Sequence, residues 1–178
     1  HYNLGVIFMK LKDYQKAKSS YEKAIQIDPN YEKAHNNQGN TYKELGEYQK
    51  ALSCYEKAAE VNPNYTDAYY NQGNTYKKLG ENQKAKEYYD KVIKLNPNYI
   101  DAYFNQGNTY NELGEYQKAK ECYEKVIELD PNNTNAYWNM YAHALNIDEA
   151  LITLNKLYKI DKNHTEARIM IAALHGYK

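Results

Sequence analysis

Residues 66–99 (TDAYYNQGNTYKKLGENQKAKEYYDKVIKLNPNY) and residues 100–133 (IDAYFNQGNTYNELGEYQKAKECYEKVIELDPNN) align without a gap. Residues 32–65 align with both, so the chain repeats itself every 34 residues. A fixed period of this length with helix-turn-helix character is typical of a stack of identical units. The sequence therefore predicts an all-α solenoid. Position 1 of each repeat is taken as Glu32, Thr66, Ile100 or Thr134.

Each repeat carries the same series of small, aromatic and helix-breaking residues. In residues 32–65 this series is Gly39, Tyr42, Leu45, Gly46, Ala51, Tyr55, Ala58 and Pro63. The series resembles the tetratricopeptide repeat family, and the resemblance covers the chain from end to end. It implies a right-handed superhelical α-solenoid of helix-turn-helix repeats that acts as a protein–protein interaction scaffold.

We expect a single array over residues 1–178 that is part of a longer chain. Its repeats span about 1–31, 32–65, 66–99, 100–133 and an atypical 134–164, followed by a terminal helix over 165–178. Solenoid ends need a polar outer face, and the apolar run Ile169 to Leu174 does not supply one. We therefore expect the chain ends to contact further repeats or another subunit.

Three kinds of residue punctuate the predicted helices. Glycine at position 15 suits a left-handed helix end, proline at position 32 stops the second helix, and threonine at position 1 offers an N-cap. These residues are Gly46, Gly80, Gly114, Pro63, Pro97, Pro131, Thr66 and Thr134. Within the first helix, Gly39 should let the partner helix approach closely while Tyr42 fills the space beside it.

The fifth repeat departs from the series and aligns only if about three residues are deleted near Asn146. Tyr141 replaces the glycine of position 8, Ala144 replaces the aromatic residue of position 11, and Lys162 replaces the proline. We expect Tyr141 to push the paired helix outward and Ala144 to give back volume. The change is either drift in a terminal repeat or a change of curvature where a partner docks.

Glutamine occupies position 7 in three consecutive repeats, as Gln38, Gln72 and Gln106. On a helical wheel this position flanks the packed face, so hydrogen bonds between the amides of neighbouring repeats are predicted.

A second polar series lies on the face opposite the glycine, which lines the concave groove in the tetratricopeptide family. Position 6 is asparagine in all five repeats, position 9 is asparagine in three, and position 5 is mostly aromatic. The candidate peptide-binding residues are Asn3, Asn37, Asn71, Asn105, Asn139, Asn40, Asn74, Asn108, Tyr70, Phe104 and Trp138.

A carboxamide can pair with both the C=O and the N–H of a peptide group, and several in series hold an extended segment with little side-chain selectivity. The series is similar to the asparagine ladder in the superhelical arm of O-linked N-acetylglucosamine transferase. The alternative is that these asparagines mainly tie neighbouring repeats together by hydrogen bonds.

The net charge limits the kind of partner, and the cysteines indicate the cellular compartment. The chain has 23 basic and 23 acidic residues, so its formal net charge is zero. This balance argues against a nucleic acid or an acidic membrane as the partner and favours a protein or peptide. Cys54 and Cys122 lie two repeats apart, too far for a disulfide. Two free thiols suit a reducing compartment, and we predict a cytoplasmic protein.

The sequence offers no catalytic motif. The histidines and cysteines lack metal-ligand spacing, and no phosphate loop or nucleophile elbow is visible. We predict no catalytic residue, no metal, no cofactor and no enzymatic activity. Two other functions stay open: the substrate-recruiting arm of a larger enzyme such as a glycosyltransferase, and an architectural subunit of a large multiprotein assembly.

Overall fold

The computed structural model describes residues 1–176, which contain eleven α-helices and no strand. The chain divides into two compact units, His1–Pro97 and Asn98–Lys178. Each unit is a series of helical hairpins, which confirms the prediction of an all-α solenoid of helix-turn-helix repeats. The single array over residues 1–178 stays a prediction.

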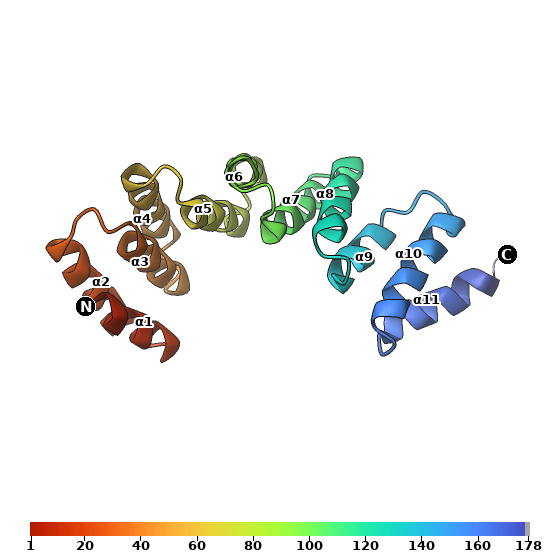
Figure 1. Ribbon diagram of the computed structural model, residues 1–178, viewed down its shortest axis with the longest axis horizontal. Coiled ribbons are helices and arrows are strands. Elements are labelled where there is room, and N and C mark those ends of the chain that lie inside the picture. Colours follow the sequence, from red (N-terminus) through yellow and green to blue (C-terminus); the bar gives the residue numbers. More distant parts are fainter. Residues whose placement is uncertain (177–178) are drawn as a thin grey trace. The chain divides into compact units, whose positions relative to one another are not determined.

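The first unit holds three hairpins, drawn from red to yellow-green in Figure 1. Within it, α1 contacts α3 and α3 contacts α5, so the first helices of the repeats form one layer. Helices α2 and α4 each pack against their own first helix and against the first helix of the next repeat, and α6 packs against α5. The helices are α1 Tyr2–Lys10, α2 Tyr14–Ile27, α3 Glu32–Glu44, α4 Tyr48–Val61, α5 Thr66–Lys78 and α6 Asn82–Leu95.

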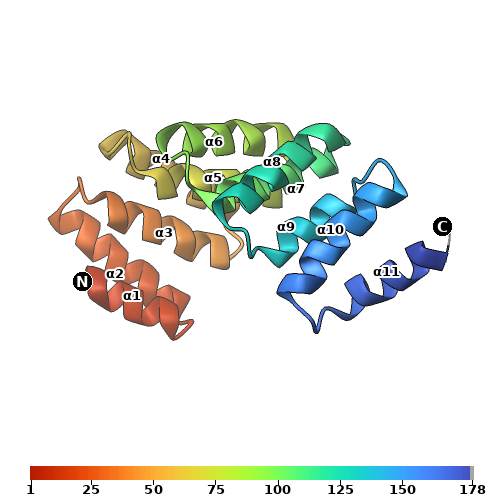
Figure 2. The same ribbon diagram turned by 45° about the vertical axis from the view of Figure 1, so that its right-hand side comes forward.

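The second unit continues the pattern with two hairpins and one further helix, drawn from green to blue in Figure 2. Here too each helix packs against the next one along the chain. The helices are α7 Ile100–Glu112, α8 Tyr116–Leu129, α9 Thr134–Tyr141, α10 Ile147–Ile160 and α11 Thr165–Gly176.

The glycine of position 8 is required by a tyrosine from the paired helix. A Cβ atom on Gly39 would lie 2.5 Å from Cε1 of Tyr55, and one on Gly107 would lie 2.7 Å from Cε1 of Tyr123. Both tyrosines are fully buried. The close approach of the two helices is therefore as predicted, but the ring against the glycine is Tyr55, whereas Tyr42 packs at the edge of the core.

The helix ends follow the predicted glycines and prolines. Gly46, Gly80 and Gly114 have φ of +78°, +76° and +74°, the left-handed conformation that glycine adopts without strain. The second helix α4 ends at Val61, where Asn62 is already extended and Pro63 follows.

The predicted threonine N-caps are wrong. Tyr65 precedes α5 as the capping residue, and the Thr66 hydroxyl donates to the Asn64 carbonyl at 3.4 Å. Ahead of α9, the Asn133 side chain accepts from the Ala136 N–H at 3.1 Å. The reason is a turn that precedes each first helix. In it, Asn62 Oδ1 accepts from the Asn64 N–H at 3.0 Å and sets the chain direction one residue before the threonine.

The fifth repeat accommodates Tyr141 in a different way from the one predicted. Helix α9 has 8 residues, against 13 in α7, and ends at Tyr141, so Ala144 lies beyond it. On α10, Leu154 stands where Tyr123 stands on α8, and Tyr141 packs against the cluster that contains Leu154. The extra volume of Tyr141 is therefore offset on the paired helix, where leucine replaces tyrosine. Ala144 does not provide this compensation.

The predicted pairing of glutamine amides between repeats is wrong in the first unit. Gln38 instead accepts from the Cys54 thiol of its own repeat, with Sγ 3.5 Å from Oε1. The same contact recurs in the second unit between Cys122 and Gln106. Both cysteines are free thiols, as predicted.

Candidate functional site

The asparagines of position 6 link each repeat to the one before it. In the first unit, Asn37 Nδ2 donates to Tyr2 Oη and Asn71 Nδ2 donates to Asn36 Oδ1, both at 2.9 Å. Asn36 is 4% exposed, whereas Asn37 and Asn71 are half-buried and Asn3 is exposed. Asn37 and Asn71 therefore make inter-repeat hydrogen bonds of the kind that the sequence left open as an alternative.

The asparagines of position 9 serve a different group, the hydroxyl of the buried tyrosine. Tyr55 Oη donates to Asn40 Oδ1 at 2.9 Å, and Tyr89 Oη donates to Asn74 Oδ1 at 2.8 Å. A buried hydroxyl needs a partner, and burial raises the pKa of Tyr55 well above its usual value. Sequence reasoning missed this bond, although asparagine at position 9 always accompanies tyrosine at position 24.

The second unit joins both kinds of bond at one atom. Tyr123 Oη donates to Asn108 Oδ1 at 2.8 Å, and Asn139 Nδ2 donates to the same oxygen at 2.9 Å. Asn108 therefore connects the core of its own repeat to the first helix of the next. Asn105 is half-buried on the same helix, one turn earlier.

These bonds determine whether the oxygen or the NH2 group of each amide remains available to a ligand. Asn71 uses an N–H toward the preceding repeat, which leaves its carbonyl oxygen as an acceptor. Asn40 uses its oxygen for the tyrosine, which leaves its NH2 group as a donor. In the described part of the chain neither remaining group has a further partner. The acceptor lies on α5 and the donor on α3, so neighbouring repeats together offer partners for the N–H and the C=O of a peptide backbone.

The aromatic candidate residues of position 5 each contact another aromatic ring of the same repeat. The Tyr70 ring centroid lies 6.2 Å from that of Tyr89, and that of Phe104 lies 5.9 Å from that of Tyr123. Trp138 lies 5.3 Å from Tyr141. Tyr70, Phe104 and Trp138 are half-buried, so only part of each ring is accessible to a ligand.

One cavity brings two of the candidate residues together. It encloses about 180 Å³ between α1, α2 and α3 of the first unit. Asn37 and Asn40 form one side, and a single charged residue, Lys10, lies at the other. The complete lining is Val6, Met9, Lys10, Tyr21, Asn37 and Asn40.

Family models match most of the repeats. A model described as "Tetratricopeptide repeat" matches residues 1–31, 66–99 and 100–133. The chain belongs to the tetratricopeptide repeat family. A second model, "TPR repeat", matches residues 39–80, and a further tetratricopeptide repeat model matches residues 20–53.

Solved tetratricopeptide structures resemble the chain over nearly its whole length. MamA is 28% identical with a TM-score of 0.82, and the match covers 92% of this chain and 97% of MamA. YrrB, described as a TPR protein with an unusual peptide-binding site, is 26% identical with a TM-score of 0.76, covering 95% of this chain and 89% of YrrB. A repeat protein from Parabacteroides merdae ATCC 43184 is 22% identical, with a TM-score of 0.78 over 96% of this chain and 69% of that one. No curated protein matches the chain.

The described residues of this tetratricopeptide chain show no group of three or more His, Cys, Asp or Glu side chains placed to hold a metal ion. Over the same residues, no helix has the length and apolar character needed to cross a membrane.

Proposed function

We propose that the chain is a protein-interaction scaffold that holds an extended partner segment against the first helices of its repeats. In the first unit the segment contacts α1, α3 and α5, and in the second unit it contacts α7 and α9. The proposed binding residues are Asn3, Asn37, Asn40, Tyr70, Asn71 and Asn74 in the first unit, and Phe104, Asn105, Asn108, Trp138 and Asn139 in the second.

The observation that carries this proposal is the cavity lined by Asn37 and Asn40. Tyr55 holds the Asn40 oxygen, so the Asn40 NH2 group is oriented before any ligand arrives. A carboxamide that is fixed in advance loses little conformational entropy on binding. Each peptide hydrogen bond contributes about 1 kcal/mol, so affinity comes from several repeats in series.

The comparisons support a peptide as the ligand. The chain belongs to the tetratricopeptide family, and YrrB, a protein of the same fold, is described as having an unusual peptide-binding site. A role without enzymatic activity, without nucleic acid and in the cytoplasm is part of the same proposal.

The test separates recognition from inter-repeat bonding with two variants of one hydrogen bond. Peptides are selected from a random display library on the immobilised chain, and their Kd is measured by calorimetry. Asn37→Ala and Tyr2→Phe both remove the bond between Asn37 and Tyr2. Only Asn37→Ala also removes the amide that lines the cavity.

We expect Asn37→Ala to weaken peptide binding about fivefold, which corresponds to one net hydrogen bond, and Tyr2→Phe to change it less than twofold. Equal affinity for both variants, with equally lowered melting temperatures, would show that the asparagine is structural. A library that yields no binder would remove the proposal altogether.

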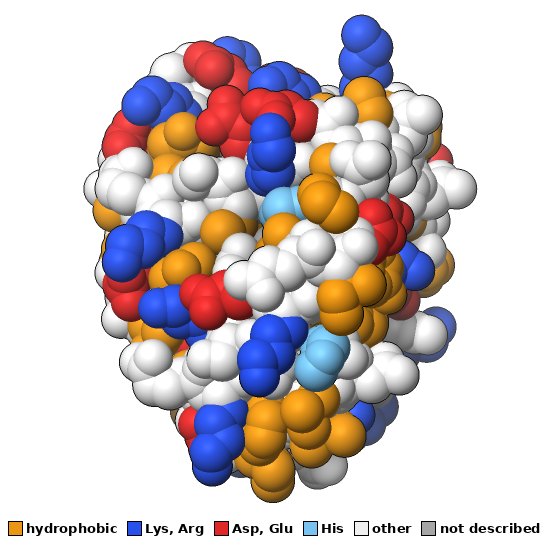
Figure 3. All heavy atoms as spheres, turned by 90° about the vertical axis from the view of Figure 1, so that its left-hand side faces the viewer, with side chains coloured by type: hydrophobic (Ala, Val, Ile, Leu, Met, Phe, Trp, Pro, Cys, Tyr) orange, Lys and Arg blue, Asp and Glu red, His pale blue; other side chains and the backbone are white. Residues whose placement is uncertain are grey.

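An architectural role is a second candidate, favoured by one exposed apolar face. Leu4 and Ile7 on α1 and Leu11 directly after it are 43%, 51% and 69% exposed. In the next repeat Thr41, at the position of Ile7, is fully buried. Figure 3 shows hydrophobic side chains among charged ones on the side of the first unit where α1 and α2 lie. Contact of this face with another subunit would be lost in Ile7→Lys, as measured by sedimentation of the assembly.

A further inference from the structure

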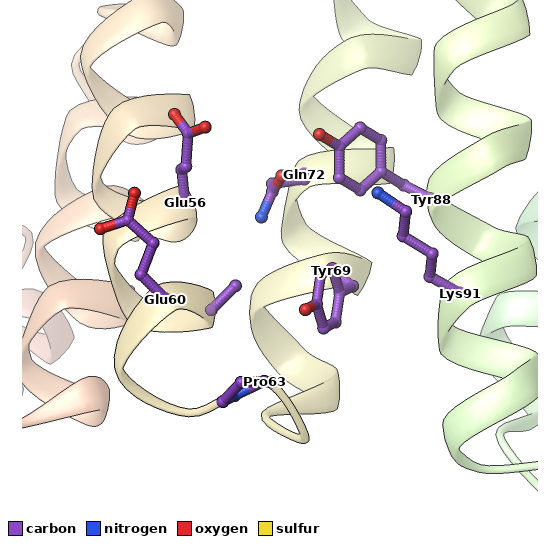
Figure 4. A pocket seen from close by; sticks show the side chains of 8 residues that line it. Glu56, Glu60, Pro63, Tyr69, Gln72, Tyr88 and Lys91 are labelled. Carbon is purple, nitrogen blue, oxygen red and sulfur yellow. The ribbon is translucent and has the colours of Figure 1, made fainter.

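A second pocket lies in the first unit, away from the asparagines. It encloses about 290 Å³ between α4, α5 and α6, and none of the residues proposed above lines it. Figure 4 shows Glu56 and Glu60 of α4 on one side and Tyr88 and Lys91 of α6 on the other. Gln72 of α5 lies between the two walls, and Ala59, Pro63 and Tyr69 complete the lining.

Gln72 is a largely buried residue that lines this pocket. It is 4% exposed, and in the described part of the chain its side chain makes no hydrogen bond. The equivalent Gln38 and Gln106 accept from a cysteine thiol of the paired helix. The Gln72 amide is not among the fully buried polar atoms that lack a partner, so it reaches the pocket, where a ligand can pair with it.

Gln72 lacks the thiol partner of Gln38 and Gln106 because Tyr88 replaces the cysteine in this repeat. Its ring stacks on Tyr76, with centroids 5.2 Å apart and an angle of 20°, so it is held by Tyr76 and not by Gln72. The Lys91 ammonium lies 4.4 Å from the Tyr88 centroid and 5.8 Å from that of Tyr69. Tyr88 and Lys91 thus form one wall of the pocket.

The charges around the pocket cancel but are separated. Glu60 pairs with Lys57 at 2.6 Å, and Glu56 on one wall is balanced by Lys91 on the other. A cation inside would face Lys91, and an anion would face Glu56 and Glu60. A neutral group with a donor end and an acceptor end can satisfy both walls at once.

We propose that this pocket binds a primary carboxamide, the side chain of a glutamine or asparagine on a partner polypeptide. The ligand NH2 group donates to Glu56, its carbonyl accepts from Lys91, and its amide pairs with Gln72. Two carboxamides can exchange hydrogen bonds in both directions. This site is independent of the peptide-binding face and takes a single side chain rather than a backbone.

The test uses four small probes that share one backbone: the N-acetyl methylamides of glutamine, arginine, glutamate and leucine. Each is titrated into the 15N-labelled chain, and the signals of the Gln72 side chain and of the backbone around the pocket are followed by NMR. We expect saturable shifts with the glutamine probe in the millimolar range and at least fivefold weaker binding of the other three.

Variants connect the shifts to Gln72. Gln72→Leu should weaken the glutamine probe about fivefold, as judged from backbone signals, and Gln38→Leu, its matched control, should not change it. Tyr88→Cys supplies Gln72 with the thiol partner of the other repeats and should also weaken binding, which keeps the test valid if Gln72→Leu fails to fold. Tighter binding of the arginine or glutamate probe, absence of saturable shifts, or equal affinity in Tyr88→Cys would overturn the proposal.

Discussion

The fourth and fifth repeats, both in the second unit, pack an aromatic ring from opposite helices: a fully buried one in the fourth repeat and a half-buried one in the fifth. In residues 100–133 the ring is Tyr123 of the second helix, and it faces Gly107. In residues 134–164 it is Tyr141 of the first helix, and its cluster contains Leu154 of the second. The comparison indicates that a larger residue on one helix goes with a smaller one on the other, and that either helix can carry the larger one.

The polar contacts change together with the ring. The tyrosine of the fourth repeat brings a hydroxyl into the core, and Asn108 accepts from it. The fifth repeat has leucine there and alanine, Ala142, at the asparagine position. In the second, third and fourth repeats, asparagine at position 9 accepts from the hydroxyl of the buried tyrosine, and this bond orients the amide that we propose faces a peptide.

The largest effect is expected when the arrangement of the fifth repeat is copied only in part. Gly107→Tyr places a ring where even a Cβ atom would lie 2.7 Å from Tyr123, and it should lower the free energy of unfolding by about 3 kcal/mol or more. Adding Tyr123→Leu should recover at least half of that loss. Urea unfolding of the three variants measures the coupling, and additive losses would show that the two positions do not exchange volume.

A smaller loss of stability is expected when the hydroxyl of Tyr55 loses its acceptor. Asn40→Ala leaves the Tyr55 hydroxyl buried without its acceptor and should cost about 1–2 kcal/mol. In a Tyr55→Phe background the same substitution should cost less than about 0.5 kcal/mol. Thermal unfolding of the double-mutant cycle measures this difference. The same cost in both backgrounds would mean that Asn40 stabilises the fold by some other contact.

Alkaline pH should lower the stability of the repeats with a buried tyrosine gradually, and by less than the substitutions above. Burial raises the pKa of Tyr123 to about 12, whereas an unfolded tyrosine ionises near 10. Between these values the unfolded chain releases protons that the folded chain keeps, so stability falls as pH rises from 10 toward 12. Melting curves from pH 9 to 11.5 should show this decline, and Tyr123→Phe should make it shallower. An unchanged slope would contradict the assignment.

The smallest effect concerns the ion pair between these two repeats. Lys120 on α8 pairs with Glu149 on α10, with side chains only 15% and 26% exposed. Hydrogen bonding to Lys120 holds the pKa of Glu149 below its usual value. Lys120→Met should lower the free energy of unfolding by up to about 1 kcal/mol at neutral pH, and this difference should vanish as pH falls through the lowered pKa. Lys118→Met, which removes an exposed pair with Glu115, is the control and should have no measurable effect.

Much of the fold could be read from the sequence because the deciding residues act locally. Gly46 needs only its own backbone angle, and Pro63 needs only its missing N–H, so both predictions are confirmed. The N-cap prediction at Thr66 failed because the turn before it, closed by Asn62, had already set the direction of the chain.

The candidate site was harder to predict, because its chemistry depends on contacts between helices. The spacing of Asn37 and Asn71 is visible in the sequence, but their partners Tyr2 and Asn36 come from another repeat. The bond from Tyr55 to Asn40 requires the register of two antiparallel helices. The unpaired state of Gln72 depends on the stacking of Tyr88 on Tyr76, and no local signal specifies it.

The central claim is that the oriented amides bind the backbone of a peptide, and an ester scan tests it most directly. Each peptide N–H in a selected binder is replaced in turn by an ester oxygen, and Kd is measured with the wild-type chain and with Asn71→Ala. We predict one position at which the ester weakens binding about fivefold to wild type and has no effect on Asn71→Ala. Ester effects that are equal in both chains at every position would contradict the account.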